Sequence, residues 1–191
     1  MGCDIHLFVE VNNNGKWESV DEWTENDGYI HVSYENRLYT DRNYSMFALL
    51  ANVRNYQGIK PICQPKGLPS DVSDEVKAYS ESWGEDGHSH TYFTLKELLE
   101  IDWNETIKEA GYMDNKRWKK FSLSLKTLHP DYDLRYPYSQ GIGPSLRCTY
   151  TWRKWEIPLK ITAGNFYDEV IPKLTELGTQ ENVRIVFFFD N

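Results

Sequence analysis

Residues 183–189 read Val-Arg-Ile-Val-Phe-Phe-Phe and are apolar at every position except Arg184. A short run that is apolar on both of its faces is typical of a strand with protein on each side. We therefore expect these residues to form a central strand of a sheet. Residues 4–11, Asp-Ile-His-Leu-Phe-Val-Glu-Val, place four aliphatic side chains on one face of a strand. They predict a second interior strand.

Other segments predict further strands at the sheet or its edge. Residues 12–15, Asn-Asn-Asn-Gly, favour a left-handed turn, so residues 16–20 can return as a hairpin partner. Residues 28–34 alternate and predict a third strand. Residues 149–157 predict an exposed or edge strand that ends at Pro158.

Helical spacing of apolar residues appears between these strands. Helices are expected in residues 43–53, 73–83, 105–110 and 166–177, and after a capping box formed by Thr94 and Glu97. Pro172 must kink the last of them or begin a new first turn. Residues 55–70 and 128–145 are rich in Gly and Pro and predict loops. The pattern indicates a single α+β domain over residues 1–191, with a mixed or antiparallel sheet and two or three helices packed on one face.

Composition excludes several classes of partner. Lys and Arg number 21 against 29 Asp and Glu, which gives a net charge of -8 and argues against binding of duplex nucleic acid. No apolar run approaches the roughly 20 residues of a membrane span. The three cysteines are an odd number without paired spacing, which argues against a secreted disulfide framework. We expect a cytoplasmic protein without a membrane partner.

Four residues could hold a metal ion. Asp4 and His6 are two residues apart on the first strand and would share one face. His88 and His90 would share a face if they are extended, and the four side chains together suit one divalent transition metal. The alternative is that His6 is a packed strand histidine, Asp4 caps a turn, and His88 and His90 are loop residues before a helix.

Two similar triplets flank the expected helix of residues 43–53. Arg42-Asn43-Tyr44 precedes it and Arg54-Asn55-Tyr56 follows it. Arg suits phosphate, Asn suits a base edge and Tyr offers a stacking surface. On a straight helix the triplets are roughly 18 Å apart, so both touch one small ligand only if the loops fold back. The alternative is that Asn43 caps the helix, Arg54 interacts favourably with the helix dipole at its carboxyl end, and the tyrosines are core residues.

Cys3 lies close to His6 in the sequence, which raises the question of a thiol nucleophile. On a strand these two positions point to opposite faces, so the imidazole would not activate the thiol. We expect a buried structural cysteine.

Several stretches resemble an uncharacterised family of small bacteriophage-encoded proteins. They are Met1-Gly2-Cys3-Asp4-Ile5-His6, residues 42–55, Gly67-Leu68-Pro69, Asp86-Gly87-His88-Ser89 and the closing Val-Arg-Ile-Val-Phe-Phe-Phe-Asp-Asn of residues 183–191. The resemblance runs through nearly the whole chain. It implies a phage-encoded protein of the host cytoplasm and implies no particular reaction.

The leading hypothesis is a pocket that needs no cofactor and binds a nucleotide-like small molecule, sequestering a host immune signal without cleaving it. Residues 55–70 would close over the ligand. The expected ligand-binding residues are Asp4, His6, Arg42, Asn43, Tyr44, Arg54, Asn55, His88 and Ser89.

Two alternatives remain open. One is a hydrolase of phosphodiester or glycosidic bonds that uses a divalent metal on Asp4, His6, His88 and His90. The other is an inhibitor that binds a host protein through its acidic surface and exposed aromatics such as Trp152 and Trp155. The sequence does not decide between binding and catalysis, or between a monomer and a homo-oligomer.

Overall fold

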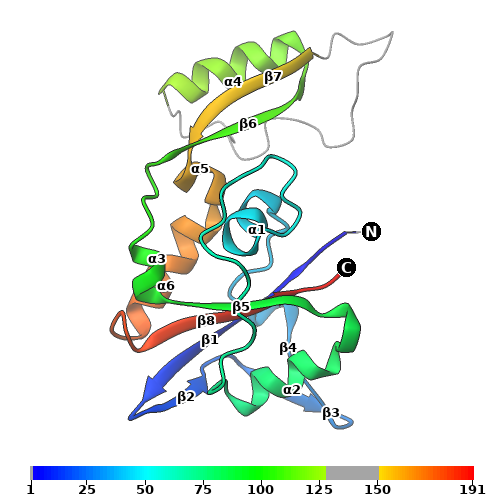
Figure 1. Cartoon of the computed structure of the whole chain (residues 1–191), viewed down its shortest axis with the longest axis vertical. Coiled ribbons are helices and arrows are strands. Elements are labelled where there is room, and N and C mark those ends of the chain that lie inside the picture. The colour runs from blue at the N-terminus through cyan, green and yellow to red at the C-terminus, as the bar shows by residue number, and fades with distance from the viewer. Residues whose placement is uncertain (1, 128–150) are drawn as a thin grey trace.

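A computed structural model describes residues 2–127 and 151–191 and has an α+β architecture, as predicted (Figure 1). The strands are β1 (Ile5–Asn13), β2 (Lys16–Ser19), β3 (Trp23–Asn26), β4 (Tyr29–Val32), β5 (His88–Thr94), β6 (Thr106–Met113), β7 (Thr151–Pro158) and β8 (Val183–Phe189). The helices are α1 (Tyr44–Ala51), α2 (Asp74–Ser82), α3 (Leu95–Leu99), α4 (Asn115–Thr127), α5 (Leu159–Ala163) and α6 (Ile171–Leu177). Short helical turns are η1 (Tyr34–Asn36), η2 (Gly84–Asp86) and η3 (Phe166–Val170).

The central sheet has the order β2-β1-β8-β5, and every pair in it is antiparallel. The prediction that β8 is a central strand is confirmed, because it pairs with β1 on one side and β5 on the other. All seven of its side chains are buried. The first and last strands of the chain therefore lie side by side, and the two termini emerge at the same end of the sheet (Figure 1).

Protein covers the sheet on both faces. Ile5, Leu7 and Phe187 belong to a large core that also takes side chains from α1, α3, α5 and α6. Phe8 and Phe188 belong to a second core, built with α2 and the β3–β4 hairpin. Figure 1 shows α2 and this hairpin on the opposite side of the sheet from α1. Helices thus pack against both faces of the sheet, whereas the sequence predicted helices on one face.

Local sequence signals set the ends of several helices. The Asn43 side chain accepts a hydrogen bond from the Met46 backbone N–H at 3.2 Å, which caps α1. Thr94 and Glu97 form the predicted capping box of α3. Pro172 lies in the first turn of α6, which follows directly on the π-helical turn η3. Residues 55–70 contain no helix or strand, as predicted.

β6, α4 and β7 form a separate arm at the top of Figure 1 with its own small core. The predicted helix over residues 105–110 is wrong. Residues 106–110 belong to β6, which pairs antiparallel with β7 and sets Glu109 opposite Trp155. Pairing with a strand that is distant in the sequence overrides the local helical preference of Lys-Glu-Ala. The predicted loop at 128–145 lies outside the described residues.

The predicted strand at residues 28–34 corresponds to β4, which pairs with β3 in a two-stranded sheet. This two-stranded sheet packs over the central sheet and is not hydrogen-bonded to it. In the two described ranges, no helix combines the length and the apolar character that a bilayer crossing requires.

Candidate functional site

The ends of β1 and β8 bring together side chains from opposite ends of the chain. The backbone N–H of Asp190 donates to the Asp4 carbonyl at 3.2 Å, and the Asp4 N–H donates to Asp190 Oδ1 at 3.0 Å. Arg42 binds the Asp4 carboxylate through Nε at 2.8 Å and Nη2 at 2.7 Å. Arg54 Nη2 donates to Asn191 Oδ1 at 2.9 Å. We call Asp4, Arg42, Arg54, Asp190 and Asn191 the strand-end cluster.

The chain folds back so that both arginines reach this cluster. Helix α1 is only eight residues long. After it, Asn52 and Arg54 both adopt left-handed backbone angles, with φ of 58° and 49°, which reverse the chain direction. The separation that a straight helix would give the two triplets therefore does not apply to this structure.

The Arg42–Asp4 ion pair lies at the surface, with about half of each side chain exposed. The Arg42 guanidinium lowers the pKa of the Asp4 carboxyl, chiefly through their hydrogen bond. Gly2 lies directly beneath this guanidinium, because a Cβ at that position would be 2.6 Å from Arg42 Nη1. The glycine thus allows Arg42 to approach the backbone closely.

Arg54 is surrounded by groups of a different kind. Its Nη1 donates to the Tyr56 hydroxyl at 3.3 Å, and its Nη2 contacts the neutral Asn191 amide. Tyr56 is 74% exposed, and its ring meets that of Tyr44 edge to face at 6.3 Å. A guanidinium and an exposed aromatic ring therefore lie together beside the ends of the strands.

His6 lies behind the cluster in a buried chain of hydrogen bonds. Its Nε2 is 3.1 Å from Asp190 Oδ2, and its Nδ1 is 3.3 Å from the Tyr79 hydroxyl, which accepts from Arg37. A carboxylate only accepts hydrogen bonds, so Nε2 carries the proton and Nδ1 accepts from Tyr79. Burial among aromatic rings lowers the pKa of His6 despite the opposing effect of Asp190. His6 is thus uncharged and connects Asp190 to Tyr79 through its two ring nitrogens.

We expect Asp190→Asn to reverse the tautomer of His6. The oxygen of the introduced amide would accept from the Asp4 N–H, so the amide nitrogen would donate to His6 Nε2 and the ring proton would move to Nδ1. The cost in unfolding free energy should be about 1–2 kcal/mol, because both hydrogen bonds persist but lose the assistance of the carboxylate charge. Nitrogen-15 NMR of the imidazole reads the tautomer directly. Asp168→Asn, at an exposed carboxylate away from the sheet, should leave it unchanged; an unaltered tautomer in Asp190→Asn would refute the assignment.

The predicted metal ligands are not gathered into one group. Ser89 has a φ of 55° at a register shift in β5, so His88 and His90 do not share a face as expected. The His88 ring contacts Phe189, whereas the His90 ring stacks on Phe188, which faces the other side of the sheet.

The remaining proposed ligands have other partners. His90 Nε2 is 2.7 Å from the Ser80 hydroxyl, and Asp4 is bound to Arg42. Across residues 2–127 and 151–191, no three His, Cys, Asp or Glu side chains are arranged to hold a metal ion. The structure therefore does not bring the four predicted ligands together as a group.

Other candidate ligand-binding residues have internal partners. Asn43 caps α1 and donates to the Thr162 carbonyl at 2.7 Å. The Asn55 amide bonds both the N–H and the carbonyl of Ile59, which closes a loop turn. Ser89 bonds its neighbour His88 at 2.9 Å. Cys3 is fully buried, and burial raises the pKa of its thiol, in agreement with the structural role expected for it.

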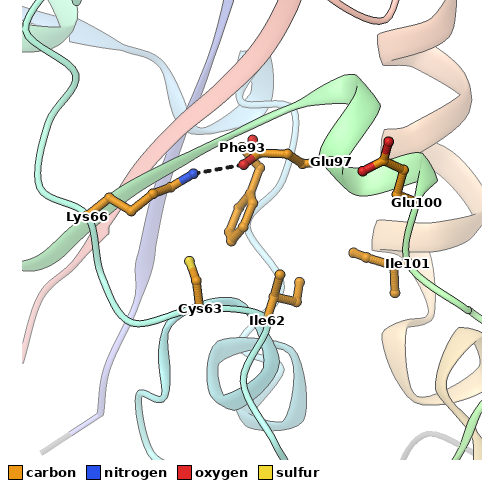
Figure 2. Close-up of a pocket in the computed structure, with 7 residues that line it drawn as sticks. All are labelled: Ile62, Cys63, Lys66, Phe93, Glu97, Glu100 and Ile101. Atoms are coloured by element: carbon orange, nitrogen blue, oxygen red, sulfur yellow. Dashed lines mark hydrogen bonds and ion pairs between the residues drawn. The ribbon is translucent and has the colours of Figure 1, made fainter.

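A pocket of about 410 Å³ lies elsewhere, between residues 62–66 and α3. Figure 2 shows Lys66 reaching across it to Glu97, with a separation of 3.1 Å between Nζ and Oε1. Cys63 and Phe93 line the same space. None of the residues predicted to bind ligand contributes to this pocket.

Sequence reasoning missed Asp190, Asn191 and Tyr79. The first two directly follow the most buried strand, and polar residues at the end of such a strand are a usable signal for a site. Tyr79 had no such signal, because its contact with His6 joins positions 73 residues apart.

No protein-family model, curated protein or solved structure matches this chain.

Proposed function

We propose that the protein binds a small phosphate-bearing, nucleotide-like ligand at the strand-end cluster and holds it without cleaving it. The observation that carries the proposal is that Arg42 contacts Asp4 and Arg54 contacts Asn191, at the paired ends of β1 and β8. Guanidinium groups suit a phosphate or diphosphate, even in a protein of net negative charge. The resemblance to bacteriophage proteins makes a host signalling nucleotide the expected ligand and sequestration in the host cytoplasm the expected role.

The aromatic residues beside the arginines support a ligand with a flat ring. Tyr56 offers an exposed ring next to Arg54, and Tyr44 supports it from the side. A base stacked on Tyr56 would place its phosphates toward Arg54 and Arg42. Such a ligand would contact residues of both arginine triplets.

Asp4 has a distinct part in this proposal. Its carboxylate occupies the donor fork of Arg42 through two hydrogen bonds, in the manner of a bound anion. A ligand phosphate would replace Asp4 on that fork. Asp4 therefore competes with the ligand and also keeps Arg42 at the site when no ligand is bound.

The proposal predicts opposite effects for the two partners of this ion pair. Arg42→Ala should weaken binding of a nucleotide by about 10- to 100-fold, as expected for loss of a charge-assisted contact. Asp4→Asn should strengthen binding by a few-fold, because it removes the competing anion. Isothermal titration calorimetry with a panel of nucleoside diphosphates and cyclic dinucleotides measures both changes.

Two checks separate binding from folding and from general charge effects. Both variants should keep the wild-type melting temperature to within a few degrees, because the ion pair is half-exposed. Lys16→Ala removes a positive charge near the opposite end of β1 and should leave affinity unchanged. If Arg42→Ala binds as tightly as the wild type, the assignment of Arg42 fails.

A further inference from the structure

The arm formed by β6, α4 and β7 is basic in a protein that is acidic as a whole. Residues 106–125 and 151–158 contain seven Lys and Arg against three Asp and Glu, whereas the whole chain carries -8. One of the three acidic side chains, Glu109, is buried. Because charges act over about 8–10 Å at physiological salt, an approaching partner experiences the local positive charge of the arm. We call these three elements the basic arm.

The β6–β7 ribbon has one covered face and one open face. Helix α4 packs against the covered face through Met113, Trp155 and Ile157. Trp155 is therefore buried, and the expectation that it forms an exposed contact patch is wrong. Trp152, the other residue of that expectation, is 51% exposed on the open face.

The open face carries an aromatic pair followed by lysines. Trp152 lies opposite Tyr112 in the strand register, and their rings meet edge to face at 5.0 Å. On the next positions of this face, Lys154 lies opposite Ala110, and Lys108 lies opposite Glu156. Successive side chains on one face of a strand are about 6.8 Å apart, so rings and ammonium groups follow one another along the ribbon.

From this arrangement we infer that the basic arm binds single-stranded nucleic acid, an activity separate from the nucleotide site at the strand ends. Unpaired bases stack on Trp152 and Tyr112, and the phosphates that follow them meet Lys154 and Lys108. An aromatic platform beside a positively charged track is the usual device for holding single strands without reading their sequence. Duplex fits less well, because its bases are already stacked on one another and cannot cover the two rings.

The test is fluorescence anisotropy with labelled oligothymidylate and oligouridylate of about 12 nucleotides, a length within the range of known single-strand sites. Both oligonucleotides should bind at low salt. Trp152→Ala should weaken binding by about 5- to 100-fold, the range for loss of one stacked base, whereas Trp152→Phe should retain most of the affinity. Because Trp152 is exposed, far-UV circular dichroism should show an unchanged fold.

Charge variants on the same face sharpen the test. Lys154→Ala should reduce the slope of log affinity against log salt by about 0.7, the value for one phosphate contact on a single strand. Glu156→Gln should raise affinity because it removes the negative charge beside Lys108. Lys77→Ala, at an exposed position on α2, is the matched control and should change neither affinity nor slope.

Three results would overturn the inference: no binding of either oligonucleotide at low salt, equal binding of a duplex of the same length, or full affinity in Trp152→Ala. An acidic peptide that displaces the oligonucleotide at lower concentration than a second oligonucleotide would assign the surface to a protein partner. Arg42→Ala should leave oligonucleotide binding intact, so this inference and the proposed nucleotide site can fail independently.

Discussion

Replacing Arg184 with Met is expected to lower the free energy of unfolding by about 3–5 kcal/mol, a large share of the 5–15 kcal/mol typical of a domain. Arg184 is the one charged residue of β8 and is 4% exposed. Its Nε donates to the fully buried Glu10 at 2.7 Å, and its Nη1 donates to Asp71 at 2.8 Å. Removing the guanidinium leaves the Glu10 carboxylate buried without its cation, which is the costly element of the change.

A second substitution separates this charge effect from lost packing over Trp17, whose ring centre is 4.0 Å from the guanidinium carbon of Arg184. In Arg184→Met/Glu10→Gln the buried negative charge is absent, and the Gln amide can still accept from the Ser73 N–H. Urea unfolding should therefore show the double variant to be more stable than Arg184→Met alone. Equal stabilities of the two variants would mean that packing, and not the unpaired carboxylate, determines the loss.

Glu109→Ala is the second substitution with a large expected effect, about 3 kcal/mol. The Glu109 carboxylate joins the basic arm to the main core: it accepts from Trp155 Nε1 at 3.1 Å, Thr162 Oγ1 at 3.3 Å and Ser45 Oγ at 3.4 Å. Alanine leaves these donors without their acceptor and opens a cavity, and both effects destabilise. Urea denaturation measures the change in unfolding free energy, and a loss below about 1 kcal/mol would contradict the role of Glu109 as the link.

Glu109→Gln keeps the shape and isolates the charge. Its amide oxygen can accept from Trp155 while its nitrogen donates to the Thr162 and Ser45 hydroxyls. Burial raises the pKa of Glu109 above its ordinary value of 4.5. Between 4.5 and the raised pKa the folded state holds a proton that the unfolded state has lost. The stabilisation that comes from this extra proton on folded Glu109 is therefore full below pH 4.5 and is lost as the pH rises through the raised pKa.

The difference in unfolding free energy between wild type and Glu109→Gln should therefore depend on pH. As the pH rises through the raised pKa, the wild type should lose stability relative to Glu109→Gln. Taking the difference removes the contributions of other shifted groups, among them Asp21, whose burial raises its pKa to about 6. A difference that does not change with pH would show that the carboxylate titrates as it does in the unfolded chain.

The sequence predicts those parts of the fold in which neighbouring residues decide the structure. The alternation in β1, the apolar run of β8 and the capping box at Thr94 are all local signals, and all three elements formed as expected. β6 was missed because its pairing with β7 depends on a distant segment. The packing of α2 against the second face of the sheet likewise depends on long-range contacts with Phe8 and Phe188.

The same limit applies to the candidate site. Arg42 and Arg54 could be selected from the sequence because their triplets flank a predictable helix. That both reach the paired ends of β1 and β8 depends on the left-handed turns after α1, which no glycine marks. The prediction that His88 and His90 share a face failed for a similar reason, because Ser89 adopts a positive φ that L residues rarely take.

We propose that Arg42 and Arg54 together hold a nucleotide-like ligand. Native mass spectrometry can test this on wild type and the Arg42→Ala/Arg54→Ala double variant, each mixed with the same cellular nucleotide extract. We expect one discrete mass increment on the wild type, an intact ligand of that mass after denaturation, and no increment on the double variant. The same increment on both proteins, or none on the wild type, would show that Arg42 and Arg54 do not hold such a ligand.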